Sequence, residues 1–172
     1  MDVVDRYVSY ITDTLDEWGV RFRVLPTRTA PGIPEADRVK HVGINSMVVV
    51  CAVGGITNHA TTNITRTFYG GAWSRSLADD LGDVIAHWGS LYAFGHRTSN
   101  PVMTDEKILW ADDCLGVRLE PFCLDGPAVH DYLAQLPALG RDIGRTLVEW
   151  TKGKNQAVAA KPSQVFYADK SP

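Results

Sequence analysis

The sequence of 172 residues lacks the features that would place it in several large classes of protein. Its net charge is −3 at pH 7 and its pI is about 5.9, so no excess of basic residues indicates binding to nucleic acid or to a membrane surface. No apolar run approaches the roughly 20 residues that a membrane-spanning helix needs. The first residues, MDVVDRYVSY, carry acidic rather than basic side chains, which argues against a secretory signal peptide.

Cysteine is scarce. The three cysteines, Cys51, Cys114 and Cys123, are odd in number and show no CxxC spacing, so the sequence predicts neither a disulfide framework nor a zinc ribbon. Two of them lie among apolar residues. We therefore expect reduced, buried thiols, which are typical of proteins that fold in the cytosol.

Motifs for nucleotide binding and for nucleophilic catalysis are also absent. Gly54 and Gly55 follow an apolar run, but the later glycines of a dinucleotide-binding loop and the Gly-Lys-Ser/Thr end of a P-loop are missing. The segment AVGG is therefore interpreted as a turn between strands. No GxSxG elbow surrounds a serine. On these grounds the sequence predicts no catalytic residue, no cofactor and no metal site.

The five histidines show no spacing that is typical of metal ligands, since no pair fits HxH, HxxxH or HExxH. A site can still form from residues that are distant in the sequence, and His59 and His96 are then the favoured pair because both lie in predicted loops. Asp112 and Asp113 lie in a predicted turn. The alternative hypothesis is therefore a small metal-dependent hydrolase or transferase with a pocket around these four residues.

Hydrophobic periodicity predicts the order of helices and strands. Apolar residues recur at three- and four-residue steps in the predicted helices, and they alternate with polar residues or form uncharged β-branched runs in the predicted strands. The predicted elements are a helix at 2–18, strands at 20–25, 47–53 and about 61–69, a helix at 74–88, strands at about 107–111 and 115–120, and two C-terminal helices separated by Pro137.

This order predicts an α+β fold: a mixed, mainly antiparallel sheet of four to five strands flanked by helices, followed by C-terminal helices and an extended tail. We divide the chain into an α/β core domain (1–125), C-terminal helices packed on the core (126–152) and an extended tail (153–172). A proline-containing loop at 26–43 is long for a compact domain, which indicates either an interaction arm or an ordinary surface loop.

Four segments resemble, in their pattern and order, the tail terminator or tail-completion proteins of long-tailed bacteriophages: VRFRVL, MVVVCAVGG, NITRTFYGGAW and SRSLADDLGDVIAHW. In that family a small α/β domain forms a homohexameric ring that caps the tail tube and receives the head-side connector. The resemblance implies a virion structural protein, either a ring-forming tail terminator or a head–tail junction (neck) component, that is not an enzyme and is assembled in the host cytoplasm. Its implied partners are copies of itself and the neighbouring tail-tube and head-connector proteins, without a membrane or sequence-specific nucleic acid.

A ring-forming protein needs surfaces that contact other subunits, and aromatic and arginine side chains are enriched at such interfaces. Two arginines share one face of a predicted strand, two aromatic residues flank a glycine pair, and a short apolar group in the tail is suited to docking on a neighbour. The predicted interface residues are Arg21, Arg23, Arg66, Tyr69, Trp73, Val165, Phe166 and Tyr167.

Overall fold

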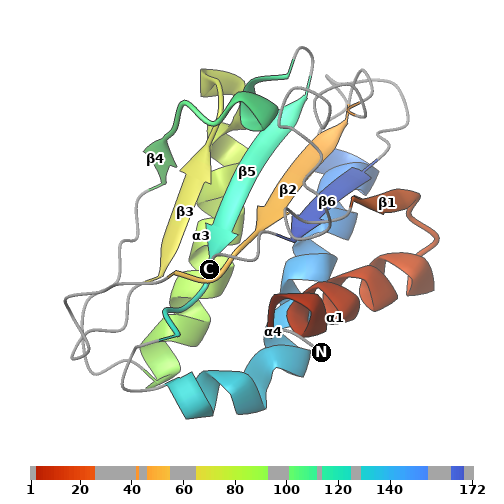
Figure 1. Ribbon diagram of the computed structural model, residues 1–172. Helices are drawn as coiled ribbons and strands as arrows, with labels where there is room; N and C mark the ends of the chain where they lie inside the picture. The colour runs from red at the N-terminus through yellow and green to blue at the C-terminus, as the bar shows by residue number, and fades with distance from the viewer. Residues whose placement is uncertain are drawn as a thin grey trace.

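The computed structural model describes residues 3–25, 42, 46–54, 65–92, 101–111, 114–124, 129–154 and 164–168. These residues form one six-stranded sheet with the strand order β1-β6-β2-β5-β3-β4 (Figure 1). The strands are β1 (Phe22–Leu25), β2 (Met47–Cys51), β3 (Arg66–Tyr69), β4 (Val102–Met103), β5 (Leu115–Glu120) and β6 (Gln164–Ala168). The helices are α1 (Val3–Glu17), α3 (Arg75–Tyr92) and α4 (Val129–Glu149), with short helical turns η1 (Ala72–Ser74), η2 (Lys107–Trp110) and η3 (Trp150–Lys154).

Parallel pairing dominates the sheet. β1 and β6, β6 and β2, β2 and β5, and β3 and β4 run parallel, whereas β3 and β5 run antiparallel. The predicted mixed sheet flanked by helices is confirmed, but the predicted antiparallel majority and the count of four to five strands are corrected. The correction has a physical reason: parallel neighbours need long crossover connections, so strands that adjoin in the sheet are distant in the sequence.

The described helices α1, α3 and α4 pack on one face of the sheet. Alternate residues of β2 and β5 point into this face, because successive side chains of a strand point to opposite sides. They join the apolar stripes of the helices in one buried core, which includes Val4, Ile11, Val49, Leu81, Val117, Leu119, Leu136 and Ile143. In the described part of the chain, no helix combines the length and apolar character needed to cross a lipid bilayer.

The opposite face of the sheet has a smaller apolar cluster. Val48 and Val50 of β2 contact Ile108 and Leu109 of η2 there. The sequence predicted a strand at about 107–111, but residues Lys107–Trp110 form a 3-10 turn. An apolar segment of this length fits either element, and here packing against the sheet determines the shape.

Two further predictions concern the C-terminal part. The helix break predicted at Pro137 was wrong, because α4 runs through Pro137 as one helix. Leu136 and Leu139 on either side of the proline are buried, so packing against the core offsets the hydrogen bond that proline removes. Within the tail, Gln164–Ala168 form β6, which lies between β1 and β2 of the same chain.

Candidate functional site

Three parallel strands end at one edge of the sheet. β2, β5 and β6 run in the same direction, so their carboxyl ends meet there. The chain continues this pairing beyond β2 and β5 through a parallel bridge between Gly54 and Cys123, in which Leu124 donates its backbone N–H to the Gly54 carbonyl at 3.0 Å. Ligands of open α/β sheets bind outside the carboxyl ends of the strands, so a functional site is expected at this edge.

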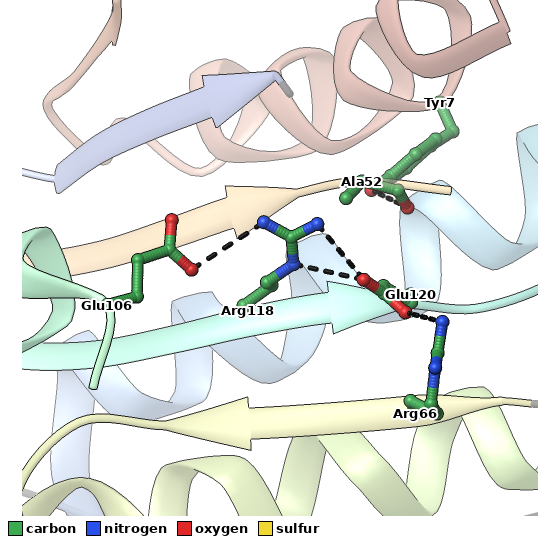
Figure 2. A network of polar contacts seen from close by, with 6 residues as sticks. All are labelled: Tyr7, Ala52, Arg66, Glu106, Arg118 and Glu120. Carbon is green, nitrogen blue, oxygen red and sulfur yellow. Dashed lines mark hydrogen bonds and ion pairs between the residues drawn. The ribbon is translucent and has the colours of Figure 1, made fainter. Parts of the chain in front are cut away.

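A cluster of charged side chains lies at this edge, on the face of the sheet that points away from the helices (Figure 2). Glu120 is the last residue of β5, and its side chain is only 8% exposed. Arg118 lies two residues earlier and therefore on the same face. Arg66, the first residue of β3, pairs with Glu120 across the antiparallel ladder.

The Glu120 carboxylate is bound by both arginines. Nη2 of Arg66 lies 2.6 Å from Oε2 of Glu120. Oε1 of Glu120 accepts hydrogen bonds from Nε and Nη2 of Arg118, each at 3.0 Å. A carboxylate at this depth needs such partners, because an ionised group removed from water is costly unless it is paired and hydrogen-bonded.

Glu106 completes the cluster from the segment before η2. Its Oε2 lies 3.6 Å from Nη1 of Arg118, so Arg118 bridges two carboxylates (Figure 2). The two arginines and two glutamates balance in charge. Arg66 is the most accessible member, with 34% of its side chain exposed, and its guanidinium lies over the Phe68 ring at 5.8 Å from the centroid. A ligand approaching from solvent therefore meets Arg66 before it meets Glu120.

The neighbouring end of β2 is held by a buried tyrosine. The Tyr7 hydroxyl donates a hydrogen bond to the Ala52 carbonyl at 3.2 Å (Figure 2). Burial raises the pKa of the Cys51 thiol to about 12, and burial also raises the pKa of Tyr7. Cys51 therefore stays protonated at neutral pH and is not a nucleophile, since the thiolate is the reactive form. All three cysteines are buried and free, as the sequence predicted.

The residues of the alternative hypothesis, His59, His96, Asp112 and Asp113, lie outside the described residues, so the pocket predicted around them stays a prediction. Within the described ranges, no group of three or more His, Cys, Asp or Glu side chains is placed to hold a metal ion.

The predicted interface residues are dispersed in the structure. Arg21 and Arg23 are exposed at β1, and Trp73 is exposed in η1. Tyr69 is buried, and Arg66 belongs to the charged cluster described above. The three tail residues lie in β6 within the chain's own sheet; these are Val165, Phe166 and Tyr167. Contact of these eight residues with another chain stays a prediction.

Sequence reasoning missed Glu120 and Arg118. A signal was available, because LGVRLE is an apolar strand interrupted at two alternate positions by charges of opposite sign. Charges at alternate positions share one face of a strand, and a strand that leads straight into Pro121 ends at that point. The pattern therefore indicated an ion pair at the end of a buried strand.

Comparisons with known proteins identify a shared fold. No family model and no curated protein matches the sequence. Two solved structures share the fold. The N-acetylmuramoyl-L-alanine amidase of Clostridium difficile 630 aligns with a TM-score of 0.68 and 15% identity, over 88% of this chain and 84% of that chain. The catalytic domain of CwlV, an N-acetylmuramoyl-L-alanine amidase of Bacillus (Paenibacillus) polymyxa var. colistinus, aligns with a TM-score of 0.61 and 15% identity, over 83% and 81%.

These matches correct the predicted function. The resemblance to phage tail terminator proteins was wrong, because the fold matches amidases over more than four-fifths of each chain. The prediction of a virion structural protein that is not an enzyme was wrong for the same reason. The prediction of a virion structural protein rested on the order of helices and strands and on the absence of catalytic motifs. Neither of these determines how the strands are arranged in the sheet. The homohexameric ring, its phage partners and the virion location were drawn from that resemblance and stay untested predictions.

Proposed function

We propose that this chain is a hydrolase that cleaves an amide bond, with Glu120 as the group that transfers protons. The observation that carries the proposal is a buried carboxylate at the carboxyl edge of parallel strands, held by two arginines in a fold shared with two amidases. The names of those two proteins suggest the substrate class, an amide that joins an N-acetylated muramic acid to a peptide.

The chemistry assigned to Glu120 is general acid–base catalysis. Its carboxylate accepts a proton from a water molecule as the water oxygen attacks the amide carbonyl carbon. The same carboxyl then gives that proton to the amide nitrogen as the C–N bond breaks, which leaves a carboxylic acid and an amine. A positioned carboxylate in this role typically contributes 10²–10⁴-fold to the rate.

The two arginines have different roles in this scheme. Arg118 is anchored by Glu106 on its other side and holds Glu120 in one orientation. Arg66 is the more exposed partner. Its guanidinium donates hydrogen bonds to the substrate carbonyl oxygen as negative charge develops there. When Arg66 turns to the substrate, Oε2 of Glu120 loses its ion pair and becomes accessible to a water molecule.

The test is the rate of amide hydrolysis by Glu120→Gln, with purified peptidoglycan as substrate and newly released amino groups as the readout. Glutamine keeps the shape of the side chain but cannot carry the proton. We expect the rate to fall by at least about 100-fold. A thermal melt of each variant establishes that the protein is folded in the assay.

The matched control is Glu106→Gln, which removes a carboxylate from the same cluster at the side of Arg118 away from Glu120. We expect its rate to fall by no more than a few fold. If the rate falls equally in the two variants, the loss of activity comes from disruption of the charged cluster and not from loss of the proton-transferring group. A folded Glu120→Gln variant with the wild-type rate would overturn the role of Glu120.

A further inference from the structure

A hollow of about 610 Å³ lies toward the start of β5, whereas Glu120 lies at its end. The lining residues come from β4, from η2 and from the segment between them: Met103, Thr104, Asp105, Lys107 and Trp110. The proposed hydrolysis uses none of them. A hollow of this size accepts a small ligand or one unit of a larger one.

Two exposed indole rings lie beside each other, and one of them, Trp110, lines this hollow. Trp110 is 39% exposed and Trp73 is 55% exposed. Their ring centroids are 6.0 Å apart and the rings are nearly perpendicular, at 87°. The Trp73 ring nitrogen donates a hydrogen bond to the Cys114 carbonyl at 2.7 Å, and that of Trp110 donates to the Thr104 carbonyl. Both rings are therefore fixed in orientation, while part of each ring remains open to a ligand.

The backbone around the two rings is shaped to hold them. Gly71 has a φ of 55°, and a Cβ atom at this position would lie 2.4 Å from the Trp73 ring. At Gly116, a Cβ atom would lie 2.3 Å from the Leu109 carbonyl oxygen, so a side chain there would displace η2. Gly71 therefore leaves room for the Trp73 ring, and Gly116, within β5, leaves room for η2, which carries Trp110.

We propose that this hollow binds a sugar ring of a glycan, stacked on Trp110. One face of a pyranose ring carries C–H groups and its rim carries hydroxyls, which matches an indole face flanked by polar side chains. Asp105 accepts hydrogen bonds from hydroxyls and Lys107 donates them. The Thr104 hydroxyl, which accepts from the Glu106 backbone N–H, retains its own proton to donate.

A protein partner fits these residues less well, because the centres of protein interfaces are depleted in Asp and Lys. The hollow has one of each among the lining residues that the structure describes. Binding of a sugar ring does not depend on hydrolysis at Glu120. Only the choice of an N-acetylated sugar as one of the probes rests on the proposed function.

The test is titration of the full chain with two probes, the tetramer of N-acetylglucosamine and the tetramer of glucose, followed by calorimetry and tryptophan fluorescence. We expect at least one probe to bind and to change the fluorescence. Trp110→Ala should raise its Kd by at least about tenfold, and Trp110→Phe should restore part of the affinity because a phenyl ring still stacks. Asp105→Asn should raise the Kd severalfold.

The control is Trp18→Ala, because Trp18 is 52% exposed at the end of α1 and does not line this hollow. It should bind like the wild type. The proposal is overturned if neither tetramer binds at millimolar concentration, or if a folded Trp110→Ala variant binds as tightly as the wild type. It is also overturned if that substitution changes only self-association, as measured by light scattering. Glu120→Gln should bind normally, so a failure here is distinguishable from a failure of the hydrolase proposal.

Discussion

The two faces of β5 carry opposite kinds of side chain. Leu115, Val117 and Leu119 point toward the helices and are buried in one large apolar core. Arg118 and Glu120 point to the other face, where each makes specific ion pairs. Apolar packing on one face holds the strand in place, and this rigidity fixes the position of the charges on the other face. A site on a packed strand is positioned more accurately than one on a loop.

The largest loss of stability is expected from a substitution on the helix-facing side of β5. Val117→Asp places an unpaired carboxylate where the native side chain is fully buried. We expect the free energy of unfolding to fall by at least about 4 kcal/mol, which is most of the stability of a domain at the lower end of the usual range. Thermal unfolding followed by circular dichroism measures it. Val102→Asp, at a half-exposed position of β4, is the control and should change stability by about 0.5 kcal/mol or less. A Val117→Asp protein that melts like the wild type would show that this face is not the core.

A smaller effect is expected on the charged face. Arg118→Met removes both hydrogen bonds to Oε1 of Glu120 but leaves the ion pair with Arg66. We expect the free energy of unfolding in urea to fall by about 1–3 kcal/mol, because Glu120 and Glu106 both lose Arg118 while the ion pair between Glu120 and Arg66 remains. The amidase rate should fall as well, since Glu120 is then oriented from one side only.

The control for Arg118→Met is Arg75→Met. Arg75 pairs with Asp79 at 3.9 Å on the exposed surface of α3, where ion pairs add little stability. We expect a change of about 0.5 kcal/mol or less and an unchanged rate. If the two substitutions lower the free energy of unfolding equally, the charged cluster stabilises the fold no more than an exposed ion pair does.

The smallest effect is on the pH dependence of stability. It comes from Cys51, which lies on the helix-facing side of β2. Burial raises the pKa of this thiol to about 12 in the folded chain, whereas an unfolded chain ionises it near 8.5. The folded state therefore binds the proton more tightly, so this contribution to stability is complete below about pH 8 and is lost as the pH rises toward 12. The slope approaches about 1.4 kcal/mol per pH unit.

Urea unfolding between pH 7.5 and 9.5 checks this slope, because tyrosine ionisation adds little in that range. Cys51→Ala should be less stable at pH 7.5 but should lose stability more slowly as the pH rises. If the free energy of unfolding falls with pH at the same slope in the variant and the wild type, the Cys51 thiol ionises equally easily in the folded and unfolded states.

The local parts of the fold were predictable from the sequence. The strand Leu115–Glu120 was predicted to the residue, and α1 was predicted to within one residue at each end, because periodicity alone determines such elements. The place of β6 was not predictable in the same way. Its partners β1 and β2 are distant in the sequence, and parallel pairing leaves no hairpin signal between them.

The function was not predictable from the order of elements. Helices and strands in a similar order are compatible with several sheet topologies, and a fold hosts many functions, so the resemblance to tail terminator proteins carried little weight. Glu120 was visible in LGVRLE as a charge at the end of a buried strand. Its partner Arg66 was not, because only the antiparallel register of β3 on β5 brings the two together.

The most direct test of the central claim is to digest peptidoglycan with this protein in water labelled with heavy oxygen and to analyse the products by mass spectrometry. The hydrolase account predicts a new carboxyl group that contains one heavy oxygen atom and a matching free amine, both absent with folded Glu120→Gln. Products labelled at a sugar carbon instead, or amide products that form equally well with Glu120→Gln, would contradict it.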